Sequence, residues 1–227
     1  MMSFQAATER TAMEKFAIVG TGDLAKECLA MLRQCPWWLA NYRFLGFICE
    51  REDEVGKELS GFTAFATDGA VLKNKEIPVT VVFPLGDPQI LGLLSKKYSG
   101  AGHIKYINAV HPSVTADWST LEMGHGNILC AGNIFTNDIV IGNFNYLNLS
   151  CTFGHNVRIG NACVVNPGAN VSGCVSLGDA VLVGTGATIL QGIKVGSRSI
   201  IGAGAVVTKD VAEGETVAGV PAKVVNR

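Results

Sequence analysis

The sequence contains four histidines, and histidine is the side chain whose charge changes closest to neutral pH. They are His103, His111, His125 and His155. His155 lies in the stretch NLSCTFGHNVRIGN, where aliphatic and glycine residues recur regularly around it. A histidine with an ordinary pKa of about 6.5 can act as a general base, for example toward an amine that attacks a carbonyl. His155 is therefore the first candidate for catalysis.

The other three histidines have settings that favour structural roles. His111 precedes Pro112 and is expected at a junction between two parts of the chain. We expect His125 at a surface corner and His103 in a loop. The alternative for His155 is an exposed corner position without a function.

An apolar residue recurs at every sixth position around His155. The matches run from Met123 to Val207, fifteen in one phase, and fail at Asp117. A period of six fits neither an α-helix nor a heptad, so a helical interpretation is excluded. Each hexapeptide instead fits one short parallel strand followed by a tight corner.

Glycine recurs within this pattern with a period of eighteen, at Gly124, Gly142, Gly160, Gly178 and Gly196. Three hexapeptides therefore make one coil of a triangular prism, and about five coils are predicted. The expected architecture is a left-handed parallel β-helix from about residue 112 to 212. Residues eighteen apart should stack, as in the column formed by Ile141, Ile159 and Leu177.

The coil period also places the neighbours of His155. In its column the preceding coil carries Asn137 and the following coil carries Gly173, which has no side chain to block the imidazole. His125 precedes His155 by thirty residues, which is not a multiple of eighteen, so the two should lie on different faces. In a second column, Asn148 stacks on Asn166, and Gly184 and Gly202 continue it.

The segment before the repeat predicts a small α/β domain. It reads as a buried strand over 16–19, a glycine turn, a helix over about 23–34, further apolar strands and a helix in DPQILGLLSKKY. Gly20 and Gly22, in the turn, could present backbone amides to a phosphate. A domain of this size holds a single nucleotide or a sugar nucleotide better than a dinucleotide. We expect a tail over 1–14, this domain over 15–111 and the β-helix domain over 112–227.

Composition excludes several classes of function. Eighteen basic and nineteen acidic residues give no excess positive charge for nucleic acid. No apolar run is long enough for a membrane span, and the first residues do not resemble a signal peptide. The seven cysteines contain no CxxC pair and read as thiols in a reducing compartment, without a metal site. We therefore expect a cytoplasmic protein.

The aliphatic-glycine hexapeptides, together with the closing segment VAGVPAKVV, resemble the left-handed β-helix of the hexapeptide acyltransferases. The order of domains is similar to one branch of that family, the N-acetyltransferases of nucleotide-linked amino sugars and the sialic acid O-acetyltransferases. This resemblance implies acetyl-CoA as acyl donor, a nucleotide-linked sugar of surface-glycan biosynthesis as acceptor, and a homotrimer with the donor between neighbouring prisms.

The resemblance also implies roles for individual residues. His155 matches the general base, Asn148 the asparagine near the acceptor, and Gly173 a glycine against acetyl-CoA. A backbone amide near Gly173 is the expected donor to the oxyanion. The expected substrate-binding residues in the small domain are Gly20, Gly22, Glu50 and Gly86. The expected cofactor-binding residues are Gly173, Gly184, Ala203 and Lys223, the lysine as a partner for phosphate.

Three departures from the family pattern stand out. Asn156 follows His155 where an acid is common, so either this amide or another group orients the ring, or the protein is weakly active. Cys49 stands where an acid is often found, and the turn GTGDLA lacks a frequent histidine.

Direct transfer to an amine is the leading interpretation, because no cysteine or serine is placed for a covalent intermediate. Cys151 and Cys163 occupy inward positions of the hexapeptides. The alternatives are O-acetylation of a sugar hydroxyl and a non-catalytic scaffold. Serine acetylation is disfavoured because that family carries a helical N-terminal domain.

Overall fold

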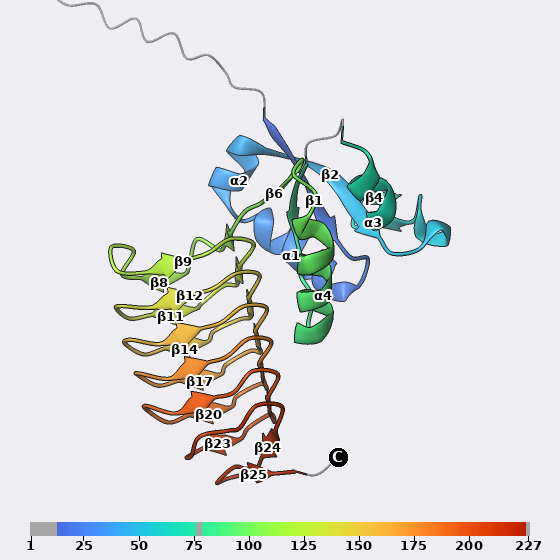
Figure 1. Ribbon diagram of the computed structural model, residues 1–227. Helices are drawn as coiled ribbons and strands as arrows, with labels where there is room; N and C mark the ends of the chain where they lie inside the picture. The colour runs from blue at the N-terminus through green and yellow to red at the C-terminus, as the bar shows by residue number, and fades with distance from the viewer. Residues whose placement is uncertain (1–12, 76–78, 226–227) are drawn as a thin grey trace, which may run out of the picture.

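The computed structural model describes residues 13–75 and 79–225 and consists of a small α/β domain beside a rod of stacked coils (Figure 1). The sheet of the small domain has the order β3-β4-β2-β1-β5-β6 and is parallel except for the β3–β4 pair. Its strands are β1 (Glu14–Val19), β2 (Tyr42–Cys49), β3 (Glu58–Leu59), β4 (Phe62–Thr67), β5 (Val79–Val82) and β6 (Ile104–Tyr106).

Helices connect these strands. They are α1 (Asp23–Leu32), α2 (Pro36–Asn41), the 3₁₀ turn η1 (Glu52–Glu54), α3 (Asp68–Lys73) and α4 (Pro88–Ser99). Helix α4 begins where Asp87 accepts hydrogen bonds from the Gln89 and Ile90 amides, with Pro88 in the first turn. The predicted first strand, first helix and α4 are present. The sequence analysis did not predict α2, the β3–β4 hairpin or α3.

The rod is the predicted left-handed parallel β-helix, and a regular coil contributes one short strand to each of three faces. Face 1 consists of β7 (Ala109–Val110), β10 (Ile128–Leu129), β13 (Tyr146–Leu147), β16 (Val164–Val165), β19 (Leu182–Val183), β22 (Ile200–Ile201), β24 (Thr216–Ala218) and the antiparallel β25 (Lys223–Val224). Face 2 consists of β8 (Thr115–Ala116), β11 (Ile134–Phe135), β14 (Thr152–Phe153), β17 (Asn170–Val171), β20 (Thr188–Ile189) and β23 (Val206–Val207). Face 3 consists of β9 (Glu122–Met123), β12 (Val140–Ile141), β15 (Arg158–Ile159), β18 (Ser176–Leu177) and β21 (Lys194–Val195).

Inward residues stack in columns along the rod, as the sequence period predicts. Ile141 pairs with Ile159, which pairs with Leu177, and all three are buried. On face 2 the rings of Phe135 and Phe153 stack with their centroids 4.7 Å apart. This repeat distance equals the strand spacing of a β-sheet, so each coil buries its apolar residue against the next.

The period of six does not detect the first coil, because this coil contains one inserted residue. Inward residues of face 2 and face 3 are six apart in later coils, for example Phe135 and Ile141, but Ala116 and Met123 are seven apart. The extra residue lies in the connection that contains Asp117, whose carboxylate accepts from Ser119 and Thr120. The phase fails there although the coil continues upstream to β7.

The glycines with a period of eighteen allow adjacent coils to approach closely. They lie at the corner between face 3 and face 1, and their φ angles are not positive. A Cβ on Gly142 would lie 2.5 Å from the carbonyl oxygen of Gly160, and one on Gly160 would lie 2.7 Å from that of Gly178. Of the two reasons for glycine in a corner, close approach therefore applies here.

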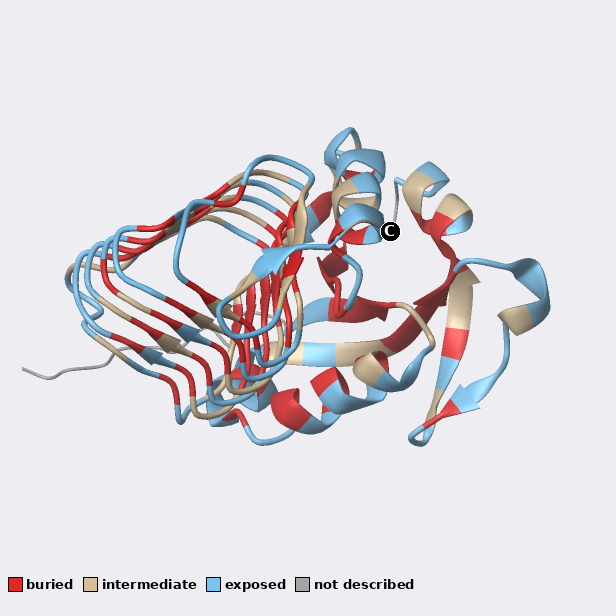
Figure 2. Cartoon of the chain, turned by 90° about the horizontal axis from the view of Figure 1, so that it is seen from below, coloured by how far each residue is buried: buried red, intermediate tan, exposed pale blue. Residues whose placement is uncertain are grey.

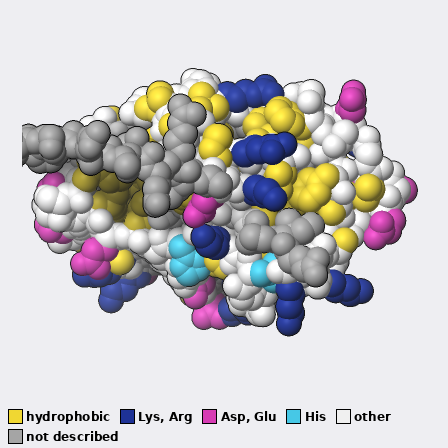
Figure 3. Space-filling model, turned by 90° about the horizontal axis from the view of Figure 1, so that it is seen from above, with side chains coloured by type: hydrophobic (Ala, Val, Ile, Leu, Met, Phe, Trp, Pro, Cys, Tyr) yellow, Lys and Arg dark blue, Asp and Glu magenta, His cyan; other side chains and the backbone are white. Residues whose placement is uncertain are grey.

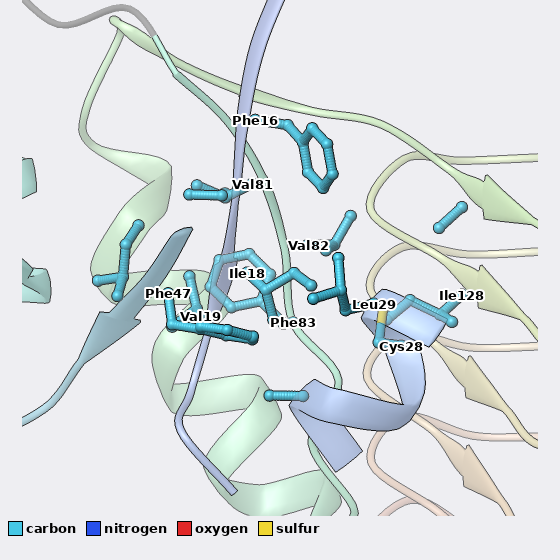
Figure 4. Packing of buried hydrophobic residues seen from close by; sticks show 14 of the residues in the cluster. Phe16, Ile18, Val19, Cys28, Leu29, Phe47, Val81, Val82, Phe83 and Ile128 are labelled. Carbon is cyan, nitrogen blue, oxygen red and sulfur yellow. The ribbon is translucent and has the colours of Figure 1, made fainter. Parts of the chain in front are cut away.

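The small domain covers the first coils of face 1, and Figure 2 shows it beside one side of the prism. Leu29 and Cys28 of α1 lie next to Ile128 of face 1 (Figure 4). Tyr146 and Val164, which point outward from face 1, are also buried in this shared core. Both residues of these strands are therefore apolar, because one packs inside the prism and the other against the small domain.

The surface carries mixed charges. On the end of the molecule seen in Figure 3, basic, acidic and hydrophobic side chains are interspersed, and the formal net charge of the chain is -1. Within the described residues, no helix is both long enough and apolar enough to span a membrane.

Candidate active site

His155 lies at the corner between faces 2 and 3, two residues after the end of β14, and its side chain is exposed. The imidazole rests on Gly173 of the next coil. A Cβ built on Gly173 would lie 2.6 Å from Nε2, 2.9 Å from Cε1 and 3.0 Å from Cδ2 of His155. The bare position predicted from the sequence is thus occupied by the ring itself, and Gly173 is buried beneath it.

The Nδ1 side of the imidazole meets two neutral side chains. Asn156 Oδ1 lies 3.0 Å from Nδ1, and the Sγ atom of Cys174 lies 3.9 Å from it. Cys174 also donates its backbone N–H to the carbonyl oxygen of His155 at 2.7 Å. Asn156 and Cys174 occupy the same column and have φ angles of +59° and +60°.

The remaining histidines lie elsewhere. His125, at the corner between faces 3 and 1, stacks on Tyr106 with centroids 5.5 Å apart. His111 contacts Ser113 Oγ at 2.7 Å, and Nε2 of His103 lies 2.9 Å from the carbonyl oxygen of Val71.

Asn148 lies at the opposite edge of face 2 from His155. It follows β13 at the corner between faces 1 and 2, and its Oδ1 accepts the N–H of Leu149 at 2.8 Å. It lines a cavity of about 250 Å³ between this corner and α1, together with Glu27, Met31 and Tyr146. The width of face 2 therefore separates Asn148 from His155 within one chain.

The other predicted cofactor-binding residues share the corner of Asn148 or lie near the end of the rod. Gly184 is buried, and a Cβ there would lie 2.5 Å from the amide nitrogen of Ala203. Ala203 and Gly204 are exposed, so backbone is accessible on the last coils. Lys223 is exposed and belongs to β25, which pairs with β24.

The predicted substrate-binding residues gather at the carboxyl end of the small sheet. Gly20 has a φ of +113° and donates its N–H to Ile48 O, which aligns the turn with β2. Gly22 is the N-cap of α1, and Glu50 follows β2. Gly86 follows β5, and a Cβ there would lie 3.1 Å from Leu24 Cδ1.

The sequence analysis did not identify two carboxylates at this edge of the sheet. Glu54 accepts from the Thr21 hydroxyl at 3.3 Å, and Glu52 accepts from the Thr67 hydroxyl at 3.2 Å. The acidic segment EREDE directly after β2 was the available signal. Cys49 donates to the carbonyl oxygens of Arg51 and Ala66, and burial raises the pKa of its thiol, so this position is neutral.

The cysteines divide into six buried thiols and one exposed thiol. Burial raises the pKa of Cys151 to about 11 and that of Cys163 to about 12, which keeps both inert. Cys174 is the exposed one, and the sequence analysis placed no cysteine near His155. Cys174 could have been placed at this corner from the sequence, because it is eighteen positions from Asn156. Among the described residues, no group of three or more His, Cys, Asp or Glu side chains could hold a metal ion.

The family model "Bacterial transferase hexapeptide (six repeats)" matches residues 174–209. PerB from Caulobacter crescentus, solved with CoA and GDP-perosamine, is 27% identical, with a TM-score of 0.84 over 95% of this chain and 99% of that chain. In sequence repeat and in fold the chain resembles the hexapeptide-repeat sugar acyltransferases. The acetyltransferase domain of PglB from Neisseria gonorrhoeae is 26% identical, with a TM-score of 0.82 over 93% of this chain and 100% of that chain.

A further solved structure shows a likeness of fold alone. WeeI from Acinetobacter baumannii is 24% identical, with a TM-score of 0.80 over 94% of this chain and all of that chain. A search of curated proteins found no match to the sequence. The matches to PerB and PglB extend over nearly the whole length of both, so the likeness includes the small domain as well as the β-helix.

Proposed function

We propose that this acyltransferase uses acetyl-CoA to acetylate the amine of a nucleotide-linked amino sugar, with His155 as general base. The observation that carries the proposal is the exposed imidazole of His155, held over Gly173 with Nε2 free of hydrogen bonds to the described residues. An amino sugar is largely protonated at neutral pH, so its attack on a thioester requires removal of a proton. A histidine is suited to this step because its ordinary pKa lies near neutrality.

The outward residues of face 2 support assembly through that face. Its strands present Thr115, Ile134, Thr152, Asn170, Thr188 and Val206, none of which is charged. Face 3 presents Glu122, Arg158 and Lys194, and the small domain covers the first coils of face 1. Ile134 is 46% exposed, and Leu149 and Leu190, at the two edges of face 2, are 47% and 42% exposed. Face 2 is therefore the face best suited to a neighbouring copy.

Packing through face 2 would complete the site. His155 and Gly173 lie along one edge of face 2, and Asn148, Gly184 and Ala203 lie along the other. A neighbouring prism brings its own Asn148 edge toward the His155 edge, which no contact within one chain does. A homotrimer with one such site at each junction satisfies this requirement for every copy.

The edge that carries Asn148 fits an extended acyl donor. Thr185, Gly186, Ala203 and Gly204 are exposed and have short side chains, which leaves backbone accessible along two coils. Lys223, near the end of this edge, would hold a phosphate of CoA. The acceptor's nucleotide would bind at the carboxyl end of the small sheet, where Gly20, Gly22, Glu50 and Gly86 meet, for use in surface-glycan biosynthesis.

The test is release of free CoA thiol from acetyl-CoA in the presence of nucleotide-linked amino sugars, with the corresponding hydroxy sugars as matched controls. We expect thiol release and a gain of one acetyl group in the product with an amino sugar. Release with a hydroxy sugar only would assign the protein to O-acetylation. An absence of release with every sugar, while acetyl-CoA still binds, would contradict the proposal.

A further inference from the structure

The hydrogen bond between His155 and Asn156 bears on the tautomer of the imidazole. Nδ1 lies 3.0 Å from Oδ1 of Asn156, and a carboxamide oxygen can only accept a hydrogen bond. Nδ1 must therefore carry the proton in the neutral ring. Nε2, on the far side of the ring, then holds the lone pair that a base requires.

Among the described residues, the groups around the ring supply no other partner of this kind. The corner position in the preceding coil is Asp138, whose carboxylate accepts from the Asn137 amide at 2.7 Å. In the following coil the sulfur of Cys174 lies 3.9 Å from Nδ1, a distance at which a thiol is a weak partner. Arg158, the next charged residue of the same coil, is exposed on face 3. Asn156 is thus the strongest hydrogen-bond acceptor on the Nδ1 side.

We propose that Asn156 is the positioning residue of the base, and that its amide oxygen holds His155 as the Nδ1–H tautomer with Nε2 available to the acceptor. The inference rests on the proposed function, which gives the imidazole its reaction. It also assigns different roles to Asn156 and Cys174, the two side chains near Nδ1. Because this nitrogen already carries a proton, it cannot take the proton of Cys174, and the thiol stays a neighbour of the base without entering the reaction.

Asn156 has a competing structural explanation that the experiment must exclude. Its φ of +59° lies in the left-handed region, where asparagine is favoured for its backbone alone. Asn156→Gly keeps this conformation accessible and removes the amide, whereas Asn156→Asp keeps an acceptor at the same place. Comparison of the two variants therefore separates the hydrogen bond from the backbone.

The first measurement is the ¹⁵N spectrum of the histidine rings in the intact protein at a pH where they are neutral. With four histidines in the chain, the His155→Gln variant assigns the signal. We expect a protonated Nδ1 and an unprotonated Nε2 in the native protein and in Asn156→Asp, and a shift toward the Nε2–H tautomer in Asn156→Gly. A native ring protonated at Nε2, or a tautomer unchanged in Asn156→Gly, overturns the inference.

The second measurement is the pH dependence of kcat, with the nucleotide-linked amino sugar that supports thiol release as acceptor. Asn156→Gly should lower kcat about tenfold, the effect of losing one hydrogen bond of about 1.4 kcal/mol, with KM for acetyl-CoA unchanged. Asn156→Asp should retain activity and move the acidic limb of the profile to higher pH, because a carboxylate favours the imidazolium. Native kcat in Asn156→Gly overturns the inference. Because the spectrum is independent of turnover, an inactive protein with the expected tautomer would refute only the proposed function.

Discussion

The imidazole of His155 covers Gly173, and no side chain at position 173 can coexist with the ring in its present place. A Cβ there would lie 2.6 Å from Nε2, a far atom of an exposed side chain that is free to rotate away. At Gly154, in contrast, a Cβ would lie 2.5 Å from the backbone nitrogen of Gly173, which cannot move without its coil. The two glycines of this corner therefore serve different purposes.

This contrast predicts opposite effects for two alanine substitutions. Gly173→Ala should fold with a nearly native Tm but lose up to about 10²-fold in kcat, because a displacement near 1 Å is enough to disable a base. Gly154→Ala should lower Tm, because the clash is with backbone. Thermal unfolding and steady-state kinetics of both variants check this prediction. A Gly173→Ala enzyme with native kcat would show that the ring position does not matter.

Removal of the base is the most direct test of the mechanism. His155→Ala should lower kcat by about 10²–10⁴ and leave acetyl-CoA binding nearly intact, because the imidazole acts on the acceptor's proton. The matched control is His125→Ala, which removes an exposed imidazole at the corner between faces 3 and 1 and should leave kcat nearly native. Full activity of His155→Ala would refute the role of this histidine.

Assembly through face 2 predicts that a charge on that face is harmful. Ile134→Lys places an ammonium group at an outward position of β11 and should shift the particle toward the monomer and abolish most activity. Ser176→Lys adds the same charge at an outward position of face 3 and should do neither. Light scattering and the thiol-release assay measure both effects. A native protein that is monomeric at working concentration would contradict assembly and the shared site together.

The sequence predicted the rod because the rule that builds it is local. Each hexapeptide repeats one strand and one corner, so the periods of six and eighteen place Ile141, Ile159 and Leu177 in one column without knowledge of any distant contact. A single inserted residue between Ala116 and Met123 was enough to hide the first coil. Periodicity therefore identifies regular coils and loses those that contain an insertion.

The candidate site was harder to predict, because its residues belong to different corners. Asn148 and His155 are seven positions apart in the sequence, and on this fold they lie at neighbouring corners of the prism. Cys174 is nineteen positions from His155, yet it contacts the ring, because one coil returns the chain to the same corner. In the small domain, Glu54 reaches the glycine turn only through the bond from Thr21, which no spacing rule reveals.

The exposed thiol of Cys174 provides a probe of the site that separates direct transfer from a covalent route. The other six cysteines are buried, and burial raises the pKa of Cys130 to about 12, so a small alkylating reagent should modify Cys174 alone in the folded protein. The adduct should inactivate the enzyme, because the added group lies beside the imidazole. Bound acetyl-CoA should slow the modification if the donor lies along this corner. Mass spectrometry counts the adducts, and thiol release follows the activity.

Cys174→Ser is the matched variant for this probe. It removes the reactive sulfur and keeps a small polar side chain at the same corner, 3.9 Å from Nδ1 in the native protein. Direct transfer from the thioester to the amine needs no enzyme thiol, so this variant should keep kcat within about threefold, the effect of altering one weak neutral contact. It should also resist the alkylating reagent. If Cys174→Ser instead loses activity to the same extent as His155→Ala, and an acetylated Cys174 is trapped in the native enzyme without acceptor, the reaction proceeds through an acetyl-cysteine and not by direct transfer.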